Sequence, residues 1–494
     1  MIAALVIVPI LAGFAVLLLP RRAEQTARWI GVAVAVLAFV AAAASYNAAD
    51  ESARWLSRPF SAAFHVGLGH GVSYWIVLLL TLVTACALLA GSPPWAARGG
   101  GPAERTFVAH MLLLLGSMVG VFVARDLLLF ALFWDLMLIP VFLAMVASRG
   151  RAAVTAWRYL IYNVAGGLVL LLATAAFGIV TGSTDVVGAG SAHAAVGGVA
   201  FAWIFGGFAF AFLIKTPVWP LHTWMPDTYA DLPSPFAAVV SAVQSKAGLY
   251  GFIVIGLGLM PAQMRAAASL MIALGVISLF YGALVALTEA DMKRVVAYSS
   301  LSHLGLILVA LFVFAPTGTP DIVALQGAVV YIVAHGLFSA ALFLVLGQIE
   351  QREETRLLAR LGGLGVRNPK LAGGLTIAAL ATLGLPGLAG FAGELLIITG
   401  IYRAGASWLA AVILVPIIIA AAYMLRLLQD VMNGPQRDDL PQRPDLSFVE
   451  GLALAPLVIA LVVLGVDPGP VANASAAALQ SPSGVALSGE HVPR

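Results

Sequence analysis

The sequence has 494 residues, of which 61% are hydrophobic and only 10% are charged, with a formal net charge of +3 at pH 7. This composition excludes a water-soluble globular enzyme of the same length, which would carry far more charge. The single cysteine, Cys86, excludes a disulfide framework, a zinc finger and a cysteine-ligated iron–sulfur cluster.

Apolar runs of about 20 residues recur along the whole chain, which is typical of a polytopic, all-α membrane protein. The first run lacks a basic start and a cleavage site and is followed by Arg21 and Arg22, so we predict a retained span and no signal peptide. We predict 14 spans near positions 2–20, 28–47, 71–91, 107–124, 126–147, 155–181, 197–219, 233–258, 266–288, 294–315, 322–347, 371–401, 407–429 and 449–466. The segment 184–198 and the tail after Val466 are rich in small residues and are predicted to be exposed and loosely ordered.

The basic residues predict an orientation. Most of the 26 lysines and arginines fall in loops that follow odd-numbered spans. Because short cytoplasmic loops carry an excess of such residues, we predict that these loops are cytoplasmic and that both termini lie on the opposite side.

An internal repeat is visible in the middle of the chain. The segment YNVAGGL at 162–168 matches YIVAHGL at 331–337, and Pro217 and Pro386 share the same offset of 169 positions (331 − 162 and 386 − 217). The matched spans lie five apart, and an odd number reverses membrane direction, so we predict two inverted five-helix repeats, each with a broken helix. The predicted domains are an N-terminal part at 1–106, a first repeat at 107–260, a second at 261–430, and a cytoplasmic loop, last helix and tail at 431–494.

Four charged residues inside predicted spans stand out. Lys215 directly precedes Pro217, which removes a backbone donor and breaks the helix. Irregular backbone at membrane depth survives only when it is buried in protein or lines a wet cavity. The other three are Asp135, Lys246 and Glu394. A charge at this depth needs a partner or water, so the set indicates an ion path. Snorkelling of Lys215 to the surface and purely structural ion pairs are the alternatives.

Two histidines are candidate proton relays because histidine titrates near neutral pH. His303 follows a run of serines, and His335 lies one helical turn after Tyr331, on the same face. A hydrogen-bonded packing role is the alternative for each histidine. His65 and His70 lack a facing pair that would favour haem, and Asp227 and Asp231 are either a proton entrance or a solvated turn. The sequence has no nucleotide-binding loop, catalytic triad or metal-ligand cluster.

These residues sit in motifs that resemble the antiporter-like membrane subunits of respiratory complex I, the proton-pumping NADH–quinone oxidoreductase, and the related Mrp antiporters. The motifs are WDLMLIP at 134–140, KTPVWPLHTWMPD at 215–227, SKAGLYG at 245–251, DMKRVVAYSSLSHLG at 291–305, AHG at 334–336 and GFAGE at 390–394. They cover most of the repeat core, between spans five and twelve.

The resemblance implies a role for each residue in proton translocation. Asp135 would pair with Lys215 in a first half-channel, Lys246 would be the central lysine, His303 and His335 would continue the path, and Glu394 would end a second half-channel. Glutamate at 394 is similar to the M branch of the family, whereas sister branches usually have lysine. Two departures stand out: Asp135 replaces the usual glutamate, and YADLP at 229–233 replaces the usual His-x-Glu-Ala-Pro.

The resemblance also implies the setting. The chain would be a multi-pass subunit of a bacterial inner membrane, beside antiporter-like sister subunits, and would bind no nucleic acid. It would carry no cofactor and no metal, with NADH, FMN, iron–sulfur clusters and quinone held by partner subunits. The departures leave open a divergent relative in a membrane-bound hydrogenase complex or an Mrp-type cation/proton antiporter.

Overall fold

The computed structural model describes residues 1–20, 22–57, 60–68, 71–91, 104–148, 150–186, 198–434 and 443–480. The predicted spans all overlap helices, and most helix ends lie within a few residues of the predicted positions. The first half contains α1 (Ile2–Leu18), α2 (Glu24–Ala44), α3 (Val72–Ala90), α5 (Glu104–Val123), α6 (Leu127–Leu136), α7 (Leu138–Ala147), α8 (Gly150–Thr181), α9 (Val199–Lys215), α10 (Met225–Asp231), α11 (Ser234–Val239), the π-helical turn η3 (Val240–Gln244), α12 (Lys246–Gly251) and the π-helical turn η4 (Phe252–Leu257). The second half contains α13 (Pro261–Ala266), α14 (Ala268–Thr288), α15 (Met292–Leu311), α16 (Ile322–Glu353), the 3₁₀ turn η5 (Leu358–Arg360), α17 (Leu364–Arg367), α18 (Pro369–Thr382), α19 (Ala389–Arg403), α20 (Ser407–Met432), α21 (Phe448–Val466) and α22 (Gly469–Gln480).

Within the described residues, 11 helices are long and apolar enough to cross a membrane, and α1 and α9 are shorter apolar helices. The predicted span 371–401 is divided into α18 and α19 by a break at 383–388. The total of 14 spans and the inverted relation of the repeats therefore stay predictions.

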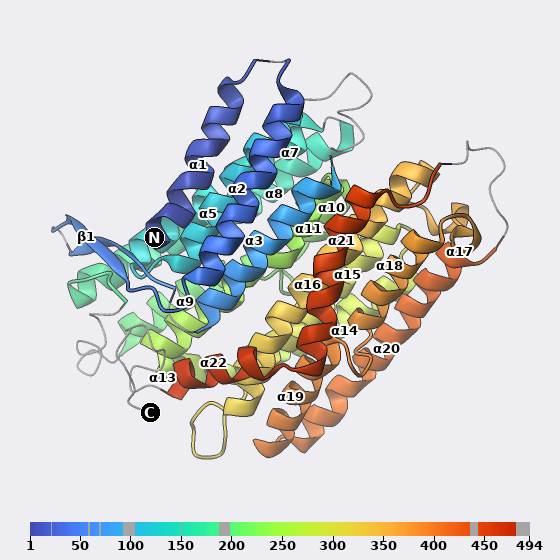
Figure 1. Cartoon of the computed structure of the whole chain (residues 1–494). Coiled ribbons are helices and arrows are strands. Elements are labelled where there is room, and N and C mark those ends of the chain that lie inside the picture. Colours follow the sequence, from blue (N-terminus) through green and yellow to red (C-terminus); the bar gives the residue numbers. More distant parts are fainter. Residues whose placement is uncertain are drawn as a thin grey trace.

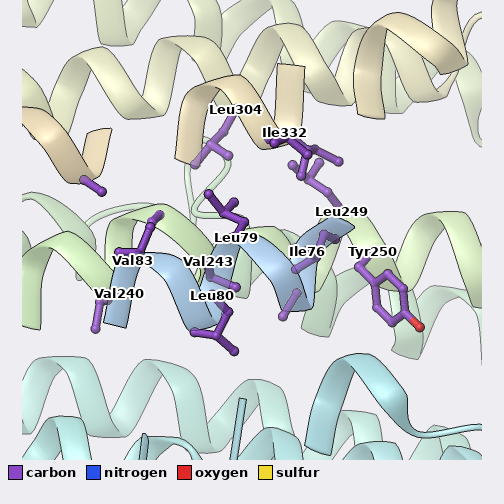
Figure 2. Close-up of a cluster of buried hydrophobic side chains, with 14 of the residues drawn as sticks. Ile76, Leu79, Leu80, Val83, Val240, Val243, Leu249, Tyr250, Leu304 and Ile332 are labelled. Carbon is purple, nitrogen blue, oxygen red and sulfur yellow. The ribbon is translucent and has the colours of Figure 1, made fainter. Parts of the chain in front are cut away.

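The helices form an inner and an outer set. The segment Ser234–Leu257 and the helix α16 are fully enclosed by other helices, and α15 nearly so, whereas α2, α8, α14, α20 and α21 present apolar side chains outward. Figure 2 shows α3 packed into this centre, where its side chains meet η3, α12 and the labelled Leu304 and Ile332. The inner set carries Lys246, His303 and His335, so their charges depend on protein neighbours and bound water and cannot reach bulk solvent directly.

Close helix packing depends on small residues. A Cβ added to Gly282 of α14 would lie 2.6 Å from the backbone nitrogen of Ser302 in α15. Acidic N-caps start several helices: Asp126, Asp291 and Asp321 each accept hydrogen bonds from two backbone N–H groups of the following turn.

The all-α class describes most of the chain, but the segment between α2 and α3 contains a β-hairpin that the sequence did not predict. Strands β1 (Glu51–Leu56) and β2 (Ala62–Val66) pair antiparallel, with Glu51 opposite Val66. Isolated bridges join this hairpin to neighbouring loops through Ser61 with Ser183 and Val66 with Ala124. Figure 1 shows the hairpin beside the N-terminus, at one end of the bundle.

The predicted loose segments also differ from the structure. Residues 469–480 form α22, in which Val471 is buried and the carbonyl of Ala472 accepts a hydrogen bond from Gln326 of α16 at 3.1 Å. Of the segment 184–198, Thr184 is buried and donates to Asp126 at 2.7 Å. The remainder of these two predictions, at 187–197 and 481–494, lies outside the described residues, as does His70.

A charged cluster holds the hairpin to the bundle. His65 in β2 places Nδ1 3.2 Å from Asp185 and Nε2 3.6 Å from Asp50, and Arg125 lies 3.8 Å from Asp50. The hydrogen bond to Asp185, then that to Asp50, raises the pKa of His65 to about 9, although burial opposes the shift. His65 is therefore a cation between two carboxylates, which makes it unsuited to haem ligation.

This cluster predicts a pH-dependent stability. Because the pKa of His65 is raised in the folded state, its contribution is fully present below the unfolded pKa of about 6.5. The contribution is lost as the pH rises through about 9. As the pH is raised from the lower to the higher of these two values, we expect the thermal unfolding temperature to decrease. We expect this decrease to be less steep in His65→Gln. Identical slopes for both proteins would contradict the assignment.

Candidate functional site

The first predicted pair, Asp135 and Lys215, comes from α6 and α9. Lys215 is buried at the C-terminal end of α9, where the helix dipole favours a cation. Its Nζ lies 4.8 Å from the ring centroid of Trp134 and has no hydrogen-bond partner among the described residues. Asp135 is half-buried, and its Oδ1 is likewise unpaired. The two charges interact through space, but the described residues form no direct ion pair between them. The short aspartate side chain leaves a gap that water or backbone would have to bridge, and the pairing of Asp135 with Lys215 stays a prediction.

Both predicted helix breaks are present. The helix α9 ends at Lys215, and the chain resumes helical structure only at Met225. The second break separates Thr382 from Ala389, and Gly384 and Gly387 within it adopt positive φ angles of 68° and 92°. Positive φ strongly favours glycine, which is why the second break tolerates this backbone.

Lys246 is the centre of the second group. It lies fully buried between two π-helical turns, η3 and η4, a local geometry that often marks functional sites. Its Nζ lies 2.6 Å from Nδ1 of His335 and also donates to the carbonyl of Ser241. When Nδ1 accepts this hydrogen bond, the imidazole proton resides on Nε2, which has no partner among the described residues. The pair thus places an amine and an imidazole where one proton can pass between them.

A row of neighbouring side chains extends from His335 through His303 and Tyr331 to Glu394. The His303 ring centroid is 5.7 Å from that of His335 and 5.7 Å from that of Tyr331. Both ring nitrogens of His303 lack partners among the described residues, and one bridging water on either side would connect them. The Tyr331 hydroxyl donates to Oε1 of Glu394 at 2.7 Å. The predicted shared face of Tyr331 and His335 is confirmed, because both contact His303.

The two groups meet at Gly248. A Cβ on this residue would lie 2.2 Å from Oγ1 of Thr216 and 2.3 Å from the carbonyl oxygen of Phe212. Glycine therefore allows the end of α9, which carries Lys215, to approach α12, which carries Lys246.

The acidic residues of α10, Asp227 and Asp231, are ion-paired, so they do not form a solvated turn, which was one of the two alternatives from the sequence. Asp227 binds Arg158 at 2.7 Å and Arg151 at 3.0 Å from α8, and also Arg294 from α15. Asp231 binds Arg151 at 3.2 Å and Arg356 at 3.5 Å. The helix α10 is thus attached to both predicted repeats by ion pairs. Sequence spacing gave no signal for this network, because its basic members come from three distant segments.

No metal cage is evident within the ranges that the structure describes. Those residues contain no group of three or more His, Cys, Asp or Glu arranged to hold a metal ion. The chemistry of the buried set is proton binding, since its members are two amines, two imidazoles, a phenol and two carboxylates.

The chain is similar to membrane proteins of known function. Residues 124–420 match the family model described as "NADH:quinone oxidoreductase/Mrp antiporter, TM". The NADH-quinone oxidoreductase subunit M of Mycobacterium tuberculosis (strain ATCC 25618 / H37Rv) is 33% identical, over 94% of this chain and 90% of that protein. A chain of respiratory complex I from Thermus thermophilus, solved with bound NADH, superposes with a TM-score of 0.84 at 29% identity, covering 97% of this chain and 98% of that one. The Mrp complex of Dietzia sp. DQ12-45-1b shares the fold, with a TM-score of 0.85 at 21% identity and 97% coverage of both chains.

The contact at Gly248 gives a stability prediction. In Gly248→Ala the added methyl meets a backbone carbonyl, so α9 must move, and overpacking of this kind costs about 1–3 kcal/mol. Gly166→Ala is the matched control, because its Cβ would meet only the Ile214 side chain at 3.4 Å or more. We expect a lower thermal unfolding midpoint in detergent for Gly248→Ala than for the control. Equal midpoints would contradict the packing described.

Proposed function

The chain belongs to the NADH:quinone oxidoreductase/Mrp antiporter membrane-subunit family, and from this premise we propose that it is a proton-translocating membrane-arm subunit of an NADH–quinone oxidoreductase. The observation that carries the proposal is the succession of buried ionisable groups from Asp135 to Glu394. Burying so many charges is a poor way to stabilise a fold, so a role in ion movement explains their presence better.

We further propose the arrangement in the membrane. The segments 107–260 and 261–430 are the two inverted repeats, and 1–106 and 431–494 flank them. The equal lengths of α8 and α16, 32 residues each, and the breaks at 216–224 and 383–388 support this division. Both termini lie outside the cytoplasm of a bacterial inner membrane, a proposal supported by the excess of basic residues in the loops that follow odd-numbered spans.

The energy for translocation comes from electron transfer in partner subunits. These partners would bind NADH, FMN, the iron–sulfur clusters and the quinone, and antiporter-like sister subunits would lie beside this chain in the membrane. The chain itself then carries no redox centre and responds through the charges that it buries.

Proton movement follows from the hydrogen bonds. A proton passed from Nζ of Lys246 to Nδ1 of His335 allows the Nε2 proton to leave toward His303. From His303 a proton reaches the Tyr331 hydroxyl, whose own proton moves to Oε1 of Glu394 along the 2.7 Å hydrogen bond. Charge on Lys215 is favoured when Asp135 is close and disfavoured when it withdraws, so their separation controls the first half of the path.

A cation/proton antiporter is the second candidate, because the matched family includes the Mrp antiporters and the Mrp complex shares the fold. A subunit of a membrane-bound hydrogenase complex is a further variant. Deleting the chain distinguishes these functions: loss of NADH-driven quinone reduction supports the first proposal. Transport that requires a sodium gradient and persists without NADH supports the antiporter.

Lys246→Met tests the proton path. A positioned proton-transfer group contributes roughly 100-fold or more to its step, and methionine keeps the side-chain volume but cannot carry a proton. We expect NADH-driven acidification of inverted membrane vesicles to lose the share that this subunit supplies. The same substitution at the exposed Lys370 is the control. Unchanged pumping in Lys246→Met would identify the chain as a scaffold.

Two adjacent glycines test the position of Asp135. A Cβ on Gly167 would lie 1.8 Å from Oδ1 of Asp135, whereas a Cβ on Gly166 would lie at least 3.4 Å from its neighbours. Gly167→Ala therefore displaces the flexible carboxylate without disturbing the backbone. We expect lower proton pumping per NADH in Gly167→Ala and normal pumping in Gly166→Ala. Equal pumping in both variants would contradict a role for Asp135 in the proton path.

A further inference from the structure

A file of polar side chains runs along one face of α8 beneath the ion pairs of α10. Thr155, Tyr159 and Asn163 are spaced by four residues, so they lie above one another on the helix, and all three are buried. The side-chain amide of Asn163 donates to the carbonyl of Tyr159 at 2.9 Å. None of these three residues belongs to the path from Asp135 to Glu394.

The outer end of the file reaches solvent. Thr155 donates to Oδ2 of Asp231 at 2.9 Å. The Asp231 side chain is only 4% exposed, whereas that of its partner Arg151 is 64% exposed. Asp231 thus lies directly beneath the surface at the α10 end of the bundle, which the predicted orientation makes cytoplasmic.

The inner end of the file comes close to Lys246. Gln244, the last residue of η3 and two positions before Lys246, donates from Nε2 to the Tyr159 hydroxyl at 2.7 Å. Because that hydroxyl already accepts one hydrogen bond, its own proton is free to be donated onward. The Tyr229 hydroxyl on α10 lies near enough to interact electrostatically with Tyr159.

Unpaired polar atoms concentrate at this place. Oδ1 of Asn163 and Oε1 of Gln244 are buried and have no partner among the described residues, and the Tyr229 hydroxyl interacts with the Ser245 side chain, next to Lys246. A buried polar atom without a partner costs about 1–3 kcal/mol, so such atoms usually bind water. Two such atoms in this part of the bundle indicate a site for ordered water between Asp231 and Lys246.

We propose that Tyr159 and Tyr229, with Tyr159 oriented by Gln244, form a proton-entry branch from the cytoplasmic side to Lys246. The inference rests on the proposed function. A proton arriving from the Asp231 side binds a hydroxyl oxygen while that hydroxyl releases its own proton toward water and the neutral amine of Lys246. Each phenol is left unchanged after the transfer, and Gln244 transfers no proton. The branch would load Lys246 without passing through Asp135 and Lys215.

The test uses Tyr159→Phe and Tyr229→Phe in the intact membrane complex. Phenylalanine at 159 keeps the ring packing on Trp224, whose centroid is 5.6 Å away. Phenylalanine at 229 keeps the ring packing on Phe343, whose centroid is 5.9 Å away, and removes only the hydroxyl that interacts with Ser245. Tyr250→Phe is the control, because its buried hydroxyl is bound to Ser73 and Phe122, away from the file.

We expect both variants to lower NADH-driven pumping toward the level of Lys246→Met, and the loss to grow as the cytoplasmic-side pH is raised and protons become scarce. The control keeps wild-type pumping and pH dependence. Wild-type behaviour of Tyr229→Phe, with pumping still lost in Lys246→Met, would overturn the entry branch and leave the proposed function intact. Normal pumping in Lys246→Met as well would overturn the proposed function itself. If Tyr159→Phe fails to assemble, Tyr229→Phe alone decides.

Discussion

The contact between Lys246 and His335 is the interaction on which the rest of the arrangement depends. An amine enclosed by protein on every side has lost its hydration, and this loss is tolerated only with a partner that can accept its proton. His335 supplies that partner at 2.6 Å, and α16 holds it in place because the helix is buried along its whole apolar length. The two π-helical turns on either side of Lys246 allow the amine-bearing helix to reach this position.

The sequence contained enough information for the helices and for the identity of the buried charges. Apolar runs of about 20 residues cannot remain exposed to water, and Lys215, Lys246 and Glu394 interrupt such runs unmistakably. The break after Lys215 was equally predictable, because Pro217 cannot continue a helix. What the sequence could not provide was distance. The gap between Asp135 and Lys215 depends on how α6, α8 and α9 pack. The importance of Gly167 becomes visible only in the structure, where the Asp135 carboxylate lies against it.

Other features were missed for related reasons. The hairpin at 51–66 is short, and the long apolar runs on either side of it dominate the hydrophobicity pattern of this part of the sequence. The ion pairs of Asp227 and Asp231 join α8, α15 and Arg356, which lie far apart in the chain. Tyr159 and Gln244 each look like ordinary residues of an apolar span, and only their hydrogen bond across two helices reveals a polar route. Long-range contacts of this kind have no local signature.

Together these contacts describe a chain that buries several ionisable side chains, each only a short distance from the next. The step from Tyr331 to Glu394 is a direct hydrogen bond, whereas those around His303 require water. An experimental map of the membrane-embedded complex, at a resolution that shows ordered water, tests this account most directly. The account predicts water density within hydrogen-bond distance of both His303 nitrogens and between Asp135 and Lys215. A dry, apolar surround at these positions would contradict it.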